Sequence, residues 1–130
     1  MEGLEVRNSG RKGRGVFASR DFSEGELIET CHVILCPEQD TEHINRTFLY
    51  NYYFNWGPER NRVAVALGFG SLYNHSYHPN ARYEKDLARN LVNFRCLKPI
   101  TRGEEITVNY NENPSDKRPV WFLKRKSEKR

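Results

Sequence analysis

Short apolar stretches separated by turn residues dominate this chain. They are rich in Val, Ile, Leu, Phe and Tyr and are bounded by Gly, Asn, Asp, Ser or Pro, a pattern typical of β-strands. Two of the turns, residues 22–28 and 100–106, resemble each other, and each places a glycine where the chain reverses. The pattern predicts a compact, mostly β domain with few short helices, whose strands cover residues 4–6, 15–19, 27–35, 63–67, 81–83, 91–97 and 106–110.

One segment has the spacing of a helix. Ile44, Phe48 and Tyr52 recur every four residues within residues 41–53, and the segment opens with residues that cap helices well. We therefore expect a helix over residues 41–53. The next segment, residues 55–61, combines Asn, Gly and Pro and predicts an exposed loop.

The length of 130 residues suits one domain with a tail. We divide the chain into a body, residues 1–116, and a basic C-terminal tail, residues 117–130. The tail carries seven basic residues and one acidic residue, a net charge of +6, and the other 14 basic and 16 acidic residues leave the body at −2. A mildly acidic body favours a basic protein or peptide partner, whereas the tail suits nucleic acid or another polyanion. A solvated end is the alternative for the tail.

The apolar runs are too short to span a membrane, and no signal segment opens the chain. We expect a soluble, intracellular protein without membrane contact, in the nucleus if it is eukaryotic or viral and in the cytoplasm if it is bacterial. Cys31, Cys36 and Cys96 are an odd number without paired spacing, which favours reduced thiols. Cys31, His32 and Cys36 have the residue types of a metal site, but their segment is apolar and strand-like, so we expect no metal.

Two polar segments in the second half of the chain are candidates for an active site. The first, NHSYHPN over residues 74–80, follows a stretch that is too rich in small residues for a strand and too apolar for a loop. Such a buried, irregular segment needs polar partners for its backbone, and Asn74, His75 and Asn80 can supply them. The second is GEEITVNY over residues 103–110. Spacing alone fits a purely structural role for these side chains as well as a functional one.

A glycine-rich segment, KGRGVFA over residues 12–18, is a third candidate. It lacks the spacing of a dinucleotide-binding loop and no helix pattern follows it. It fits either a close approach of the backbone to a ligand or an ordinary tight turn into a strand. The sequence also shows no serine elbow, no cysteine beside a histidine in such a turn and no Walker loop, which disfavours nucleophilic enzymes and nucleotide-binding loops of those kinds.

Residues 12–18, 74–80 and 103–110 occur in the order and spacing found in SET-domain protein lysine methyltransferases. The resemblance covers residues from about 4 to 110, and with the run ALGFG over residues 66–70 the chain looks most like the minimal viral and bacterial SET proteins. It implies a β-clip of small sheets, in which the segment holding Asn74 and His75 passes beneath another segment to form a pseudoknot. That topology is a rare exception to the rule against threading.

The resemblance also implies roles for individual residues. Tyr110 is expected to be the catalytic tyrosine, with its hydroxyl near the sulfonium methyl group of the cosubstrate S-adenosylmethionine. Tyr52, Tyr83 and Val108 are expected to line the channel for the substrate lysine, and core packing is the alternative for each aromatic side chain. The residues expected to hold S-adenosylmethionine are Lys12, Gly13, Arg14, Asn74 and His75.

The chain departs from many SET enzymes because it lacks their zinc-binding cysteine clusters before and after the domain. The wall of the lysine channel must then come from elsewhere. Trp121 and Phe122 in the tail are available for this, and we assign Trp121 to the cosubstrate pocket, where it would cover the adenine. A second subunit is the other source, and for this reason we expect a homodimer.

Two functions follow as hypotheses. The first is S-adenosylmethionine-dependent methylation of a lysine on a basic protein, such as a histone tail in a eukaryotic nucleus or a DNA-binding or ribosomal protein in a bacterium. The second is a catalytically inactive β-clip module that binds a protein partner or a polyanion. The presence of Tyr110 together with Asn74 and His75 favours the enzyme, because a binding module need not retain these side chains together.

Overall fold

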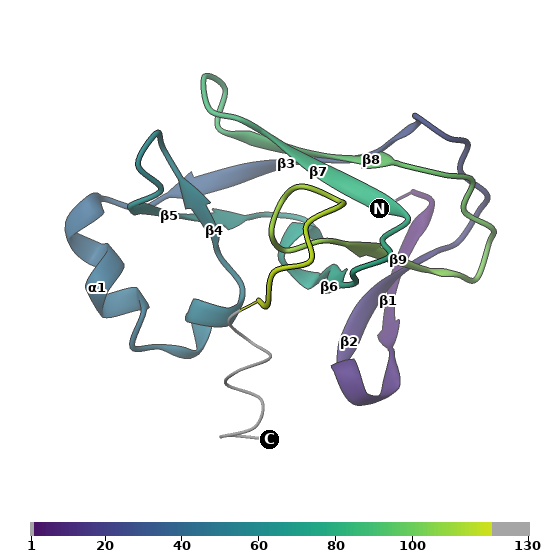
Figure 1. Ribbon diagram of the computed structural model, residues 1–130, viewed down its shortest axis with the longest axis horizontal. Helices are drawn as coiled ribbons and strands as arrows, with labels where there is room; N and C mark the ends of the chain where they lie inside the picture. The colour runs from purple at the N-terminus through teal and green to yellow at the C-terminus, as the bar shows by residue number, and fades with distance from the viewer. Residues whose placement is uncertain (1, 121–130) are drawn as a thin grey trace.

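The computed structural model describes residues 2–120, which form two β-sheets with short helical elements in the connections between strands (Figure 1). The strands are β1 (Leu4–Asn8), β2 (Arg14–Ala18), β3 (Leu27–Leu35), β4 (Phe54–Trp56), β5 (Arg62–Ala66), β6 (Asn74–His75), β7 (Ala81–Asp86), β8 (Leu91–Cys96) and β9 (Glu105–Val108). The helical elements are η1 (Gly10–Lys12), η2 (Glu38–Asp40), α1 (Thr41–Ile44), η3 (Phe48–Asn51) and η4 (Gly70–Leu72). The strand order is β1-β2-β9-β6 in one sheet and β4-β5-β3-β8-β7 in the other.

The predicted mostly β fold of small sheets is confirmed. Each of the seven predicted strands is present, and β3 has the predicted bounds. Side chains along β8 and β9 alternate between buried and less buried positions, as expected for strands that pack one face on a core. The apolar periodicity therefore located these elements correctly, although β9 ends at Val108 rather than at Tyr110.

The predicted helix over residues 41–53 is wrong. The α-helix covers only Thr41–Ile44, and the short 3-10 helix η3 follows it. Thr47 separates them with an extended backbone (φ −110°, ψ 169°), and its hydroxyl accepts a hydrogen bond from the Leu49 N–H. Phe48 is 70% exposed, so the apolar positions of this segment do not form one buried face. Without such packing a short helix is marginal.

The prediction of an exposed loop over residues 55–61 is also wrong at its start. Asn55 and Trp56 belong to β4, which pairs with β5, and Trp56 is only 3% exposed. The turn begins at Gly57, whose positive φ of 89° suits glycine. Gly57 and Pro58 form the hairpin turn. Strand β4 continues up to this turn because the Trp56 indole is buried.

The chain crosses from one sheet to the other and back between β5 and β7. In between it contributes β6 to the first sheet, parallel to β9, with Asn74 opposite Thr107 and His75 opposite Val108. Asn80 then continues this edge, because its side-chain NH2 donates to the Glu105 carbonyl and its oxygen accepts the Thr107 N–H, both at 2.9 Å. This crossing brings residues 74–75 close to the end of β9, and the pseudoknot stays a prediction.

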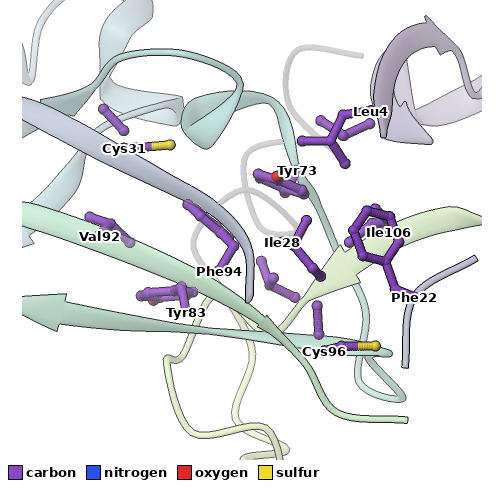
Figure 2. Close-up of a cluster of buried hydrophobic side chains, with 14 of the residues drawn as sticks. Leu4, Phe22, Ile28, Cys31, Tyr73, Tyr83, Val92, Phe94, Cys96 and Ile106 are labelled. Carbon is purple, nitrogen blue, oxygen red and sulfur yellow. The ribbon is translucent and has the colours of Figure 1, made fainter. Parts of the chain in front are cut away.

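The core contains buried side chains from both sheets (Figure 2). Tyr73, just before β6, stacks on Phe94 of β8 with a centroid distance of 4.3 Å. Its hydroxyl donates to the buried carboxylate of Glu29 at 2.7 Å, and the Phe69 N–H also donates to this carboxylate. These bonds satisfy a buried acidic group. They also fix Tyr73, which lines the cavity of the candidate site.

The segment after β9 folds back on the body. Buried Asn109 donates to the Asp116 carbonyl at 2.6 Å, and the Tyr77 hydroxyl donates to the Arg118 carbonyl at 2.9 Å. Val120 is 2% exposed. Residues 117–120 therefore contact the body, and the division of the chain after Asp116 stays a prediction.

No helix within residues 2–120 is long and apolar enough to cross a membrane. All three cysteines are free thiols. Within the same part of the chain, no group of three His, Cys, Asp or Glu side chains is arranged to hold a metal ion.

Candidate active site

The glycine turn between η1 and β2 presents its backbone to solvent. Gly13 has a φ of 79°, and the space where its side chain would lie is open. Gly15 is different, because a Cβ atom there would overlap the Glu105 carboxylate and the Asn74 amide. A ligand can therefore lie against the turn at Gly13, whose own N–H and carbonyl bond to Gly10 and Ser9 within the turn, while Gly15 allows β2 to lie close to β9 and β6.

Asn74 links this turn to β9. Its side-chain NH2 donates to the Arg14 carbonyl at 3.1 Å, to the Ser9 hydroxyl at 3.2 Å and to the Glu105 carboxylate at 2.7 Å. The Lys12 ammonium lies 4.0 Å from the other oxygen of the same carboxylate. One amide group thus holds together three segments that are far apart in the sequence.

His75 links β6 to the catalytic candidate Tyr110. Its Nδ1 accepts the Tyr110 backbone N–H at 3.0 Å, so in the neutral ring the proton is on Nε2. Burial, with a smaller contribution from the positive charge of Lys12, lowers the pKa of His75 to about 4. The imidazole is therefore neutral at physiological pH and remains a hydrogen-bond acceptor for Tyr110.

We predict that His75 makes the protein less stable in mild acid. Its pKa is about 4 when folded and 6.5 when unfolded, so the unfolded chain takes up a proton first as the pH falls. Its contribution is present above pH 6.5 and is lost as the pH falls toward 4, by about 2 kcal/mol between pH 7 and pH 5. Urea unfolding at both pH values should show this loss in the wild type but not in His75→Gln. A matched control, exposed His78→Gln, should keep the wild-type loss, and an equal loss in His75→Gln would contradict the assignment.

Tyr110 is fixed at three points. Its N–H bonds to His75, its carbonyl accepts the Tyr83 hydroxyl at 3.1 Å, and its own hydroxyl donates to the Tyr73 carbonyl at 2.6 Å. Burial raises the pKa of the Tyr110 hydroxyl, with smaller contributions from Tyr52 and Glu105. The hydroxyl is thus protonated at neutral pH. Because its proton points to Tyr73, its oxygen can act toward a ligand only as an acceptor.

A cavity of about 70 Å³ adjoins Tyr110. One part of its wall is aromatic and apolar, and another part, formed by residues such as Asn55 and Asn111, is polar. The cavity brings together all of the predicted channel residues and the predicted catalytic tyrosine, and its aromatic and apolar lining consists of Tyr52, Tyr53, Phe54, Tyr73, Tyr83, Val108 and Tyr110.

None of the cosubstrate candidates among the described residues lines this cavity. Asn74 and His75 adjoin the glycine turn and the Tyr110 backbone, whereas the Tyr110 ring lines the cavity. The roles of these residues stay predictions. Trp121, the remaining cosubstrate candidate, lies outside the described residues.

Sequence reasoning missed three charged residues in the cavity wall, Arg60, Lys85 and Glu112. A signal was present for one of them, because Lys85 follows Tyr83 by two positions in β7 and so shares its face of the strand. Glu112 and Arg60 lie in turns, where no periodicity indicates which way a side chain points.

Comparison with known proteins agrees with this fold. The SET domain family model matches residues 13–111. The chain is 33% identical over 120 residues to a Schizosaccharomyces pombe histone-lysine N-methyltransferase named as H3 lysine-37 specific, covering 92% of this chain and 76% of that protein. It is 27% identical over 123 residues to the N-lysine methyltransferase KMT5A of Xenopus tropicalis, covering 85% of this chain and 37% of the relative.

A solved Plasmodium falciparum structure, itself named as a candidate histone methyltransferase, has a TM-score of 0.66 and 26% identity, covering 82% of this chain and 96% of the other. The family match and the relatives together define a protein-lysine N-methyltransferase. The chain belongs to the SET-domain family, so the resemblance inferred from its three motifs is confirmed.

Proposed function

We propose that this protein transfers a methyl group from S-adenosylmethionine to lysine side chains of histones. One observation supports this most strongly: Tyr110 contacts both features that such a reaction needs. Its backbone is bonded to His75, next to the glycine turn, and its ring lines the aromatic cavity. A cosubstrate on one side and a lysine on the other would then meet at the Tyr110 hydroxyl.

The residues around the glycine turn fit S-adenosylmethionine. The space beside Gly13 is open to a ligand, Asn74 fixes the turn against β9, and neutral His75 places no positive charge beside a cationic ligand. These residues, with Lys12 and Arg14, would hold the cosubstrate. When bound, S-adenosylmethionine supplies a methyl group activated by its positively charged sulfur.

The cavity suits a lysine that must lose its proton. At neutral pH a lysine amine with a pKa near 10.4 is protonated about a thousandfold over the free base, and removing the proton costs roughly 4 to 5 kcal/mol. Aromatic walls disfavour the ammonium form and lower its pKa, and a nearby cation does the same. The Tyr110 hydroxyl is a poor base with a raised pKa, so its role is to orient the amine as a hydrogen-bond acceptor.

Histones are the substrate that the relatives favour. The Schizosaccharomyces pombe relative is named for histone H3, and the acidic body, with a net charge of −2 from residues 1–116, is complementary to a basic protein. A histone substrate would place the protein in the nucleus. Homodimerisation, contact of the tail with nucleic acid and the position of Trp121 stay predictions.

A substrate panel tests the proposal. We expect label from methyl-labelled S-adenosylmethionine to appear on core histones at least about tenfold faster than on a non-histone protein of similar basic charge, a difference of roughly 1.4 kcal/mol. Histones with chemically acetylated lysines are the matched control and should take up no label. Equal labelling of the non-histone protein would exclude the histone preference, and absence of label on every protein would exclude the enzymatic function.

A further inference from the structure

A charged cluster of Arg60, Lys85 and Glu112 forms part of the cavity wall. Glu112 Oε1 lies 3.3 Å from Arg60 Nη2 and 3.5 Å from Lys85 Nζ. The three residues come from different parts of the chain: the turn between β4 and β5, strand β7 and the segment after β9. Among the described residues that line the cavity, Glu112 supplies the only carboxylate. A basic ligand that reaches this part of the cavity therefore meets one acidic group.

Two members of the charged cluster have an unusual backbone conformation. Within residues 2–120, the non-glycine residues with positive φ are Arg60 (55°), Asn90 (54°) and Glu112 (76°). Asn90 lies in the turn between β7 and β8, and asparagine tolerates this conformation well. Arg60 and Glu112 also lie in turns, closed by bonds from their N–H groups to the Gly57 and Asn109 carbonyls, but neither residue type favours this conformation. Such residues are enriched at ligand sites, and these two form an ion pair in the cavity wall.

The two cations that contact Glu112 differ in how firmly they are held. The Lys85 side chain is 12% exposed, whereas the Arg60 side chain is 62% exposed. Burial lowers the pKa of Lys85, and the charge of Glu112 partly opposes this effect. Arg60 reaches the carboxylate through one nitrogen atom at 3.3 Å, and exposed pairs of this kind add little to stability. Lys85 is thus the fixed partner of Glu112, and Arg60 can be displaced.

We propose that Glu112 determines substrate specificity by binding a basic side chain next to the target lysine, and that Arg60 occupies this place in the free protein. The proposal rests on the lysine methylation proposed above. Exchange of Arg60 for a substrate guanidinium leaves the net charge of the cluster unchanged. A substrate arginine can also contact the carboxylate through two nitrogen atoms where Arg60 uses one, and two-point contacts of this type are the stronger ones.

Paired peptides test this specificity directly. Each peptide carries one lysine and one arginine, and the arginine lies one or two residues before or after the lysine. Its twin carries citrulline, the uncharged isostere of arginine, at the same position. For the wild type we expect the best arginine peptide to exceed its twin about tenfold in kcat/KM. The ratio is measured within one protein preparation, so a loss of folded protein in a variant does not affect it.

Variants then assign the preference to the charged cluster. In Glu112→Gln the ratio should fall to about one, and in Glu112→Lys a glutamate-flanked peptide should become the better substrate. Arg60→Gln should raise kcat/KM for the arginine peptide severalfold, because the competing guanidinium is gone. Glu84→Gln is the matched control: Glu84 also lies between two arginines, Arg82 at 3.7 Å and Arg95 at 3.5 Å, but it is not part of the cavity, so its ratio should equal that of the wild type.

Two results separate this proposal from the one on which it rests. If the wild type methylates both twins equally, prefers glutamate-flanked peptides, or has a ratio that Glu112→Gln leaves unchanged, the role of Glu112 is wrong while lysine methylation stands. If the wild type methylates no peptide and no protein of the histone panel, both proposals are overturned.

Discussion

Replacing Tyr110 by phenylalanine is expected to lower the rate of methyl transfer by about a hundredfold or more, with little change in the binding of either substrate. The hydroxyl donates to the Tyr73 carbonyl at 2.6 Å and belongs to a ring in the cavity wall. The substitution removes this oxygen but keeps the ring and the backbone bond to His75. The target amine then loses the acceptor that orients it. Single-turnover kinetics with saturating cosubstrate measure this step without interference from product release.

Loss of one hydrogen bond could also act through stability, by about 1 kcal/mol, and Tyr77→Phe controls for this. The Tyr77 hydroxyl likewise donates to a backbone carbonyl, that of Arg118 at 2.9 Å, but it is outside the cavity lining. Tyr77→Phe should lose similar stability and keep the wild-type rate. A Tyr110→Phe protein that transfers methyl groups as fast as Tyr77→Phe would contradict the role given to Tyr110.

Replacing Asn74 by aspartate is expected to destabilise the protein by roughly 2 to 4 kcal/mol and to weaken cosubstrate binding at least tenfold. The Asn74 NH2 donates to three acceptors, one of them the Glu105 carboxylate at 2.7 Å. Aspartate offers only acceptors to these groups and places a second negative charge beside Glu105. The glycine turn then loses its link to β9, and with it the position of Gly13.

The pH dependence of this variant gives a further check. Two neighbouring carboxylates raise each other's affinity for a proton, so Asn74→Asp should recover part of its stability relative to the wild type as the pH falls below about 6. Asn93→Asp is the matched control, because Asn93 accepts the Thr30 hydroxyl through its oxygen at 2.7 Å, a role that aspartate can also fill. Calorimetric binding and urea unfolding measure both effects, and normal binding of S-adenosylmethionine by Asn74→Asp would contradict the proposed pocket.

The sequence predicted the strands well because their apolar positions pack on a real core. Residues 27–35 and 91–97 show this, since the structure places β3 and β8 there. The helix over residues 41–53 failed for the opposite reason: the same kind of apolar spacing includes Phe48, which is exposed. Periodicity reports which side chains could share a face, but tertiary packing decides whether that face is buried.

The candidate site was predictable where residues act together in motifs. Asn74, His75 and Tyr110 were found because their segments resemble those of SET proteins, and the structure brings His75 and Tyr110 into direct contact. Spacing alone could not have joined them, because that contact depends on the parallel pairing of β6 with β9. Glu112 and Arg60 escaped prediction since each lies in a turn whose backbone conformation the sequence does not reveal.

The most direct test of this account is to incubate the wild-type protein with methyl-labelled S-adenosylmethionine and histone H3, and to locate the label by mass spectrometry. We expect labelled methyl on the Nζ atom of a lysine, formed at least about a hundredfold faster by the wild type than by Tyr110→Phe. A folded wild-type protein that binds histone H3 but leaves every lysine unlabelled would contradict it, and would support a binding module on the same fold.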